Sequence, residues 1–338
     1  MKKELIAAGF VISSLLSPLK ALAADFSQFF VFDNSLSDTG NVFNATQSLP
    51  SGPIPPSPPY FQGRFSNGRI WVDYVGEEIG LTPTLFTNLS NTIPTQGINF
   101  AFGGANSGNS NAFVPGAPGI LTQIDFFTQT LQASNQKADP NALYAIWGGA
   151  NDYLFSQNPN VDQTIENVSN AIRTLNQTGA KNILVFNLPD LGKIPLVLGS
   201  ENSQNLTTLT NIHNTALMKA LGQFSSIPGI NIIPVDINSL FDKVLANPEE
   251  FGFKYTDTSC IVYKIEINQV LRTCDNPNDY LFFDEVHPTT NAHKLVAQTA
   301  LTAIKAKSVP ESSLVLSMLI FGALGVGKIL KLKRKQAT

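Results

Sequence analysis

The chain has 338 residues, which is enough for one large α/β domain or two smaller domains with a full hydrophobic core. Its 22 Lys and Arg residues against 25 Asp and Glu residues give a formal net charge of −3. No basic cluster lies between the two ends of the chain, and phosphate binding requires a concentrated basic surface, so nucleic acid is not expected as the main partner.

The first 23 residues have the three-part order of a secretory signal peptide. Lys2 and Lys3 precede an apolar run at Leu5–Leu16, and Ala21-Leu22-Ala23 forms an A-x-A cleavage site. A buried N-terminal helix is the alternative, but the ordered arrangement favours the signal. We therefore predict export of a mature domain that begins at residue 24.

Apolar runs rich in β-branched or aromatic residues predict buried strands, and stretches with helical periodicity follow most of them. The predicted strands are Phe29–Phe32, Ile98–Phe102, Leu143–Trp147, Ile183–Leu188 and Ile230–Val235. The clearest predicted helices are Ile120–Ala133, Val161–Leu175, Leu206–Phe224 and Thr290–Lys305. This alternation predicts a parallel sheet covered on both faces, a doubly wound (flavodoxin-like) three-layer α/β sandwich.

Three of the predicted strands are followed by residues that could take part in catalysis. Ser35 follows the first strand, Gly104 the second and Asn151 the third. Ligands of doubly wound folds bind beyond the carboxyl ends of the strands. We therefore expect these three residues on one rim, with the proline-rich loop at 49–59 near the mouth of the site.

Ser35, Asn151 and His287 fit one reaction. A serine hydroxyl attacks a carbonyl only if a base takes its proton, and the resulting oxyanion needs hydrogen-bond donors. Asp284 precedes His287 by three residues, which on a helical turn places both side chains on one face, where the carboxylate can orient the imidazole. The alternative for Asp-x-x-His is a helix N-cap beside a surface histidine.

Four short blocks resemble, in the same order, those of the GDSL or SGNH esterase and lipase family. These blocks are Ser35-Leu-Ser-Asp-Thr-Gly-Asn41, Asn99-Phe-Ala-Phe-Gly-Gly-Ala105, Gly149-Ala-Asn-Asp152 and Asp284-Glu-Val-His287. The resemblance implies an SGNH-hydrolase fold and a serine esterase or lipase that works through an acyl-enzyme without a cofactor.

The same resemblance implies roles for individual residues. Ser35, His287 and Asp284 would form the catalytic triad. The backbone N–H groups of Ser35 and Gly104 and the side-chain amide of Asn151 would form the oxyanion hole. A zinc site is not expected, because the Asp/His pair lacks a clear third ligand.

One position departs from the family pattern. The family's Gly-Asp-Ser-Leu is here Asp33-Asn34-Ser35-Leu36. Asp33 would strain the turn if the glycine has a positive φ, although Asp tolerates that region better than most residues. Its carboxylate would also oppose an oxyanion nearby. Asn34 can still accept a hydrogen bond through its amide oxygen.

Substrates implied by the resemblance are acyl lipids, small esters and O-acylated polysaccharides. The alternative, motivated by Asp33, is a catalytically impaired surface protein that keeps the fold and binds glycan or lipid. The remaining polar residues have simpler interpretations. Asp152 is expected to hold its loop, Asp38 to cap the helix after Ser35, and His213 and His293 to be structural or exposed.

Cys260 and Cys274 lie in a polar stretch just before Asp284. Export makes a disulfide between them possible, and such a bond would hold the segment that leads to Asp284. Two unpaired structural thiols are the alternative.

The last 29 residues, 310–338, carry a second membrane signal. An apolar run without charge after Glu311 ends near Lys328 and is followed by a basic tail. This pattern predicts a membrane helix with the tail inside and the domain, residues 24–309, outside. It resembles the bacterial PEP-CTERM sorting tail, although Pro310-Glu311-Ser312 lacks the second proline. We therefore expect the domain at the cell envelope or outside the cell.

Overall fold

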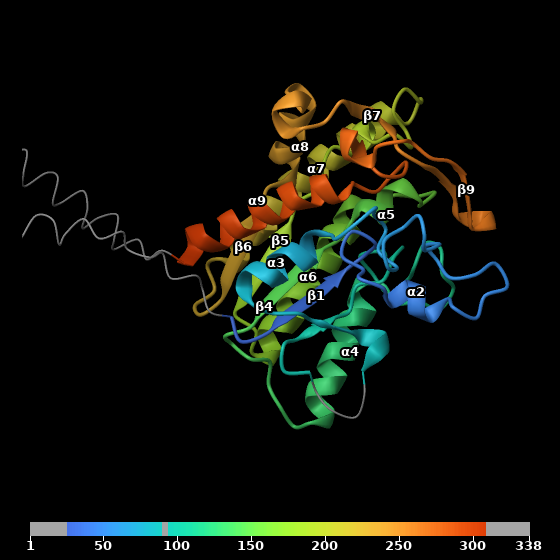
Figure 1. The fold of residues 1–338 in the computed structure, drawn as a ribbon. Coiled ribbons are helices and arrows are strands. Elements are labelled where there is room, and N and C mark those ends of the chain that lie inside the picture. The colour runs from blue at the N-terminus through green and yellow to red at the C-terminus, as the bar shows by residue number, and fades with distance from the viewer. Residues whose placement is uncertain (1–25, 90–93, 309–338) are drawn as a thin grey trace, which may run out of the picture. The chain divides into compact units, whose positions relative to one another are not determined.

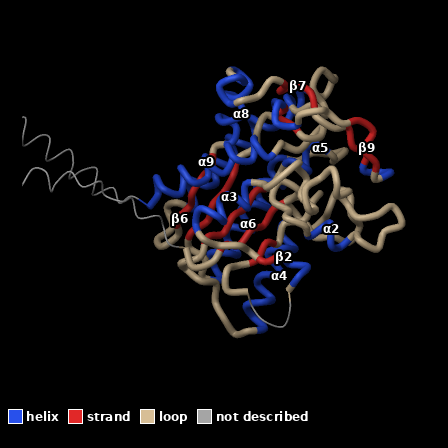
Figure 2. The backbone as a smooth tube through the Cα atoms, viewed as in Figure 1, coloured by secondary structure: helices blue, strands red, loops and turns tan. Residues whose placement is uncertain are grey.

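A computed structural model describes residues 26–89 and 94–308. The folded unit spans Asp25–Ile304 and is built on a six-stranded sheet (Figures 1 and 2). The predicted signal peptide (1–23) and the predicted membrane segment (310–338) lie outside the described residues. Within the described part of the chain, no helix is both long enough and apolar enough to cross a membrane.

The sheet is parallel, with the strand order β2-β3-β1-β4-β5-β6. Its strands are β1 (Phe29–Asp33), β2 (Thr84–Leu85), β3 (Ile98–Asn99), β4 (Leu143–Trp147), β5 (Asn182–Phe186) and β6 (Asn231–Val235). Without the edge strand β2, this is the flavodoxin-like order, in which the winding reverses between β1 and β4. The predicted α/β class is confirmed, and the predicted second strand is shorter than expected.

Helices cover both faces of this sheet. They are α2 (Asn41–Ala45), α3 (Trp71–Ile79), α4 (Ile120–Ala133), α5 (Ala150–Leu154), α6 (Val161–Thr178), α7 (Ser203–Phe224), α8 (Ile237–Ala246) and α9 (Thr290–Ser308). The four predicted helices correspond to α4, α6, α7 and α9. The sequence did not predict α3, which contains Gly76. A Cβ at Gly76 would lie 2.4 Å from the carbonyl oxygen of Leu81, so the tight return of the chain after α3 requires glycine there.

Alternate residues of the strands point to opposite faces. Phe30 and Phe32 of β1 pack into a large buried apolar cluster, under α4, α6 and α7. On the other face, the Trp71 ring of α3 lies 6.1 Å from the Phe29 ring and 4.6 Å from the Phe186 ring, between centroids. The α3 and α9 helices lie on this second face (Figure 1).

Two small sheets follow the main sheet in the chain. Strands β7 (Tyr255–Ser259) and β10 (Tyr280–Phe282) pair in parallel, and β8 (Val262–Lys264) and β9 (Gln269–Arg272) form an antiparallel hairpin. Beyond β10, the amide N–H of Phe283 donates to the carbonyl oxygen of His287 at 2.7 Å. The small sheets therefore position the turn that carries Asp284 and His287.

Candidate active site

Ser35 lies on the tight turn that follows β1. The side-chain oxygen of Asn34 accepts from the N–H of Leu36 at 3.0 Å. Asn34 thus accepts a hydrogen bond through its amide oxygen, as expected from the sequence. Asp38 then accepts from the N–H groups of Asn41 at 2.5 Å and Val42 at 3.0 Å, at the start of α2. The predicted capping role of Asp38 is thus confirmed, and the turn holds Ser35 beyond the carboxyl end of the sheet.

Asp284 and His287 lie in a turn and not in a helix, so the predicted helical turn was wrong. This turn separates β10 from α9. The Oδ1 atom of Asp284 accepts from the N–H groups of Val286 at 2.8 Å and His287 at 2.7 Å. These two hydrogen bonds close a turn that brings the side chains of Asp284 and His287 together, although the two residues are not in a helix.

The imidazole of His287 bridges the carboxylate and the serine. Its Nδ1 atom lies 2.7 Å from Oδ2 of Asp284, and its Nε2 atom lies 2.7 Å from Oγ of Ser35. With the proton on Nδ1, Nε2 can accept the proton of the serine hydroxyl while the carboxylate holds the tautomer. The structure therefore brings together the three residues that the sequence suggested for catalysis.

The surroundings of Asp284 favour its charged form. Burial alone would raise the pKa of this carboxyl group, but the charge and hydrogen bond of His287, the hydroxyl of Tyr60 and the N–H of Val286 outweigh burial and hold the pKa below its ordinary value. A carboxylate that stays ionised can stabilise the imidazolium that forms when the serine loses its proton.

Three candidate oxyanion donors line one cavity with Ser35. Within the described residues, the backbone N–H groups of Ser35 and Gly104 have no acceptor. The Nδ2 atom of Asn151 donates one hydrogen to the carbonyl oxygen of Ala105 at 2.8 Å, which orients the amide and leaves its second hydrogen available. Gly104 has a φ of +79°, and a Cβ there would lie 2.6 Å from Oδ1 of Asn111, so the loop requires glycine.

The cavity beside Ser35 has a volume of about 200 Å³. Its apolar lining includes Val42, Phe65, Phe113, Phe155 and Leu196. The rings of Phe113 and Phe155, both partly exposed, meet edge to face with centroids 4.5 Å apart. Such a lining suits an apolar group attached to a reacting carbonyl.

Asp33 is not among the residues that line this cavity, so its side chain does not crowd the site as the sequence had suggested it could. It is the last residue of β1, and it is not among the residues with positive φ. Its side chain is fully buried and accepts from the hydroxyl of Ser37, which in turn accepts from the indole N–H of Trp71 at 2.9 Å. Burial, followed by the nearby charge of Asp38, raises the pKa of Asp33 well above its ordinary value, which favours the neutral acid.

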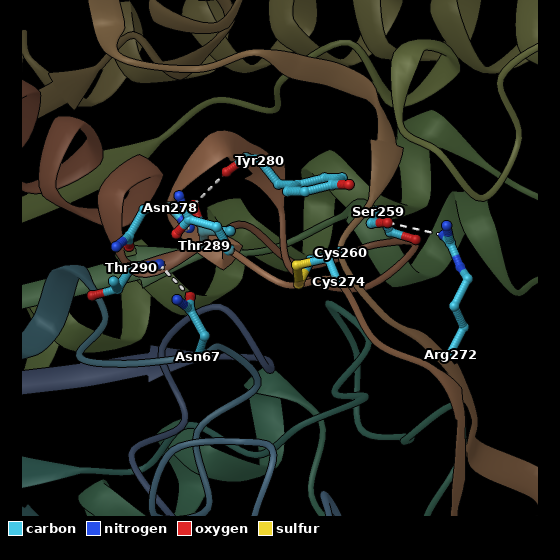
Figure 3. The surroundings of a disulfide bond; sticks show 10 residues. Asn67, Ser259, Cys260, Arg272, Cys274, Asn278, Tyr280, Thr289 and Thr290 are labelled. Atoms are coloured by element: carbon cyan, nitrogen blue, oxygen red, sulfur yellow. Dashed lines mark hydrogen bonds between the residues drawn. A yellow bond between two sulfur atoms is a disulfide. The ribbon is translucent and has the colours of Figure 1, made fainter.

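Cys260 and Cys274 form a disulfide next to the turn (Figure 3). The N–H groups of Cys260 and Ile261 donate to the carbonyl oxygens of Phe282 at 3.1 Å and Phe283 at 2.7 Å, directly before Asp284. In the same region Arg272 donates to the carbonyl oxygen of Ser259 at 2.9 Å (Figure 3). The disulfide therefore holds the hairpin against the strand that leads to the site.

Residues outside this arrangement have structural contacts. Asp152 accepts from the N–H and the hydroxyl of Ser107 at 2.8 and 2.7 Å, as expected for a loop anchor. His213 and His293 are buried, and burial lowers the pKa of His213 to about 4 and that of His293 to about 3. Sequence reasoning missed Tyr60, whose hydroxyl donates to Asp284, because nothing local to the proline-rich loop signals a partner 224 residues away.

Comparisons with known proteins agree with this geometry. The model of the family described as GDSL-like lipase/acylhydrolase matches residues 30–300. A phosphatidylcholine-sterol acyltransferase of Aeromonas hydrophila is 28% identical, covering 88% of this chain and 97% of that protein. A GDSL esterase/lipase of Arabidopsis thaliana is 28% identical over 79% of this chain and 84% of its own.

Among solved structures, a lipase/acylhydrolase from Enterococcus faecalis overlaps with 83% of this chain and 96% of its own, at a TM-score of 0.41 and 11% identity. The family model, in contrast, covers well over half of the chain, including Ser35, Asn151 and His287. The chain therefore belongs to the GDSL-like lipase/acylhydrolase family and is a carboxylic ester hydrolase.

Proposed function

We propose that this protein is an exported serine esterase that hydrolyses esters with an apolar acyl group through an acyl-enzyme. The observation that carries the proposal is the bridge of His287 between Ser35 and Asp284, with 2.7 Å on each side. In this mechanism Oγ of Ser35 attacks the ester carbonyl while Nε2 of His287 takes the hydroxyl proton. The imidazolium then gives that proton to the leaving alcohol, which departs and leaves the acyl group on Ser35.

The second half of the reaction uses the same groups. Water attacks the acyl-enzyme, His287 takes its proton, and the acid leaves as Oγ of Ser35 recovers a proton. In both halves the tetrahedral oxyanion would accept from the N–H groups of Ser35 and Gly104 and the free hydrogen of Asn151. Asp284 stays ionised throughout and stabilises the imidazolium.

The substrate proposal rests on the lining of the cavity. Its aromatic and aliphatic side chains favour the acyl chain of a lipid or small ester beside Ser35. The export proposal rests on the sequence of residues 1–23, and the proposal of an anchor at a membrane rests on residues 310–338. O-acylated polysaccharide is a further substrate class, and a preference for the shortest acyl groups in the test below would agree with it.

The test is hydrolysis of p-nitrophenyl esters, from acetate to palmitate, by the protein and by its Ser35→Ala variant. Turnover that is lost in the variant is expected, and the preferred chain length distinguishes small esters from lipids. A fluorophosphonate probe should label the wild type and fail to label Ser35→Ala, because only an activated serine reacts. A folded wild type that shows neither turnover nor labelling would contradict the proposal and support a protein that binds glycan or lipid without catalysis.

A further inference from the structure

Tyr60 makes a direct hydrogen bond to the candidate acid–base pair. Its hydroxyl donates to Oδ2 of Asp284, the oxygen that also lies 2.7 Å from Nδ1 of His287. We propose that Tyr60 is a positioning residue for the reaction: its hydroxyl fixes the orientation of the Asp284 carboxylate and reduces the negative charge that the carboxylate presents to the imidazole. This inference rests on the proposed function.

The two oxygens of Asp284 are held by different parts of the chain. Oδ1 accepts from two backbone N–H groups within its own turn, those of Val286 and His287. Among the described residues, Tyr60 is the one group outside the turn that donates to Oδ2. The Nδ1 atom of His287 lies 2.7 Å from Oδ2 and 2.9 Å from Oδ1. Without Tyr60, the nearer oxygen, Oδ2, would be held by the imidazole alone, which itself changes protonation during the reaction.

The position of the Tyr60 hydroxyl is set by rigid neighbours. The Tyr60 ring is almost fully buried, and it meets the ring of Phe283 edge to face at 5.1 Å and that of Tyr263 at 5.3 Å. The same cluster contains Cys260, so the disulfide packs against the tyrosine. The carbonyl oxygen of Tyr60 accepts from the hydroxyl of Ser57 at 2.8 Å, which holds the backbone as well. A tyrosine fixed in this way can hold a carboxylate in place.

Other titratable groups lie near the pair without bonding to Asp284. The hydroxyl of Tyr263 donates to Asn268 at 2.9 Å, and burial followed by the nearby charges of Asp284 and Glu266 raises the pKa of Tyr263. The charge of Glu285 is also near Tyr60. His293 is buried on α9 and accepts from the N–H of Trp71 at 3.4 Å. None of these groups shares a hydrogen bond with Asp284 in the described part of the chain, so Tyr60→Phe removes a hydrogen bond to Asp284 that no other of these groups makes.

Removal of the Tyr60 hydroxyl should shift the pH profile of kcat/KM in one direction. A carboxylate that has lost one donor concentrates its charge, and the attraction between that charge and the protonated imidazole of His287 increases. The protonated, inactive form then persists to higher pH, so the acid limb of the kcat/KM profile moves to higher pH. Loss of orientation also slows the chemical step, by about tenfold in kcat with little change in KM.

The experiment compares Tyr60→Phe with Tyr144→Phe. Tyr144 is a matched control, because it is also fully buried and its hydroxyl donates to a single acceptor, the carbonyl oxygen of Asp139 at 2.9 Å. We expect Tyr60→Phe to lower kcat and shift the acid limb upward with p-nitrophenyl butyrate, and Tyr144→Phe to leave both unchanged. A Tyr60→Phe profile that coincides with that of the wild type would overturn the inference while leaving the proposed function intact.

A double-mutant cycle distinguishes positioning from a general effect on folding. If Tyr60 acts through Asp284, then Tyr60→Phe should have little further effect on kcat in an Asp284→Asn background. An undiminished effect in that background would contradict the inference. If Tyr60→Phe does not fold, the wild type supplies the readout, since a proton NMR signal far downfield from the bonded Tyr60 hydroxyl is expected and its absence would overturn the proposal.

Discussion

Asp33 and Asp284 are both buried carboxyl groups near Ser35, yet their pKa values move in opposite directions. Asp284 receives hydrogen bonds from Tyr60, His287 and two backbone N–H groups, and its pKa is held below the ordinary value. Asp33 accepts from the hydroxyl of Ser37, while its Oδ1 has no partner among the described residues, and its pKa is raised.

The difference shows how two carboxyl groups of one chain can take different roles. Burial disfavours the charge at both positions, and the donors present decide whether that cost is offset. Asp284 therefore supplies a fixed negative charge next to His287. The raised pKa of Asp33 favours its neutral form, on the sheet face that carries Trp71.

The largest expected effect is that of Asp284→Asn. The amide keeps the shape of the side chain but cannot hold the imidazole in the required tautomer or stabilise the imidazolium, so kcat should fall by about 10³–10⁴-fold. The measurement is kcat for a p-nitrophenyl ester in variant and wild type, with circular dichroism as the control for folding. A loss below tenfold in a folded variant would remove Asp284 from its assigned role.

An intermediate effect, on stability and not on rate, is expected for Asp33→Gly. The change leaves a cavity in a fully buried site and removes the acceptor of Ser37, so the melting temperature should fall by roughly 5 °C. Calorimetry gives this value, and ester hydrolysis below the transition gives the rate. Faster turnover in this variant would show that Asp33 does impair the site, and the comparison with Asp284 would fail.

The smallest effect is expected for Asp33→Asn, and it depends on pH. A raised folded pKa means that the folded state binds the proton more tightly, so the contribution of Asp33 to stability is complete below the unfolded pKa of about 3.9 and is lost as the pH rises toward the folded pKa. Asn has no such proton to lose. The melting temperature of the variant minus that of the wild type should therefore increase as the pH rises from about 4 to 8.

Asp284→Asn is a control with the opposite expected dependence of stability on pH. Its lowered folded pKa contributes stability above a pH of about 4, which is lost as the pH falls through the folded pKa. Asp284→Asn should accordingly lose stability relative to the wild type at neutral pH and less so in acid. Parallel curves of melting temperature against pH for Asp33→Asn and wild type would contradict the raised pKa of Asp33.

Much of the architecture could be predicted from local pattern. Leu143–Trp147 and Ile120–Ala133 coincide with β4 and α4 at both ends, because long apolar periodic runs admit few alternatives. The short helices α3 and α8 were missed although both are amphipathic, because a helix of nine or ten residues shows few repeats of the helical period. Trp71, for example, is buried through its contacts with Phe29 and Phe186, which no local pattern reveals.

The reactive residues on the rim of the sheet could be identified from local patterns in the sequence. The strand ends predicted that Ser35, Gly104 and Asn151 lie along one edge of a parallel sheet. The spacing of Asp284 and His287 suggested a pair, although the turn that joins them is not the helical turn expected. The direction of the Asp33 side chain and the hydrogen bond from Tyr60 to Asp284, in contrast, depend on the three-dimensional fold. The reason is physical: strand order and spacing follow from short-range periodicity, whereas the direction of a side chain and a contact between distant loops depend on the packing of the whole core.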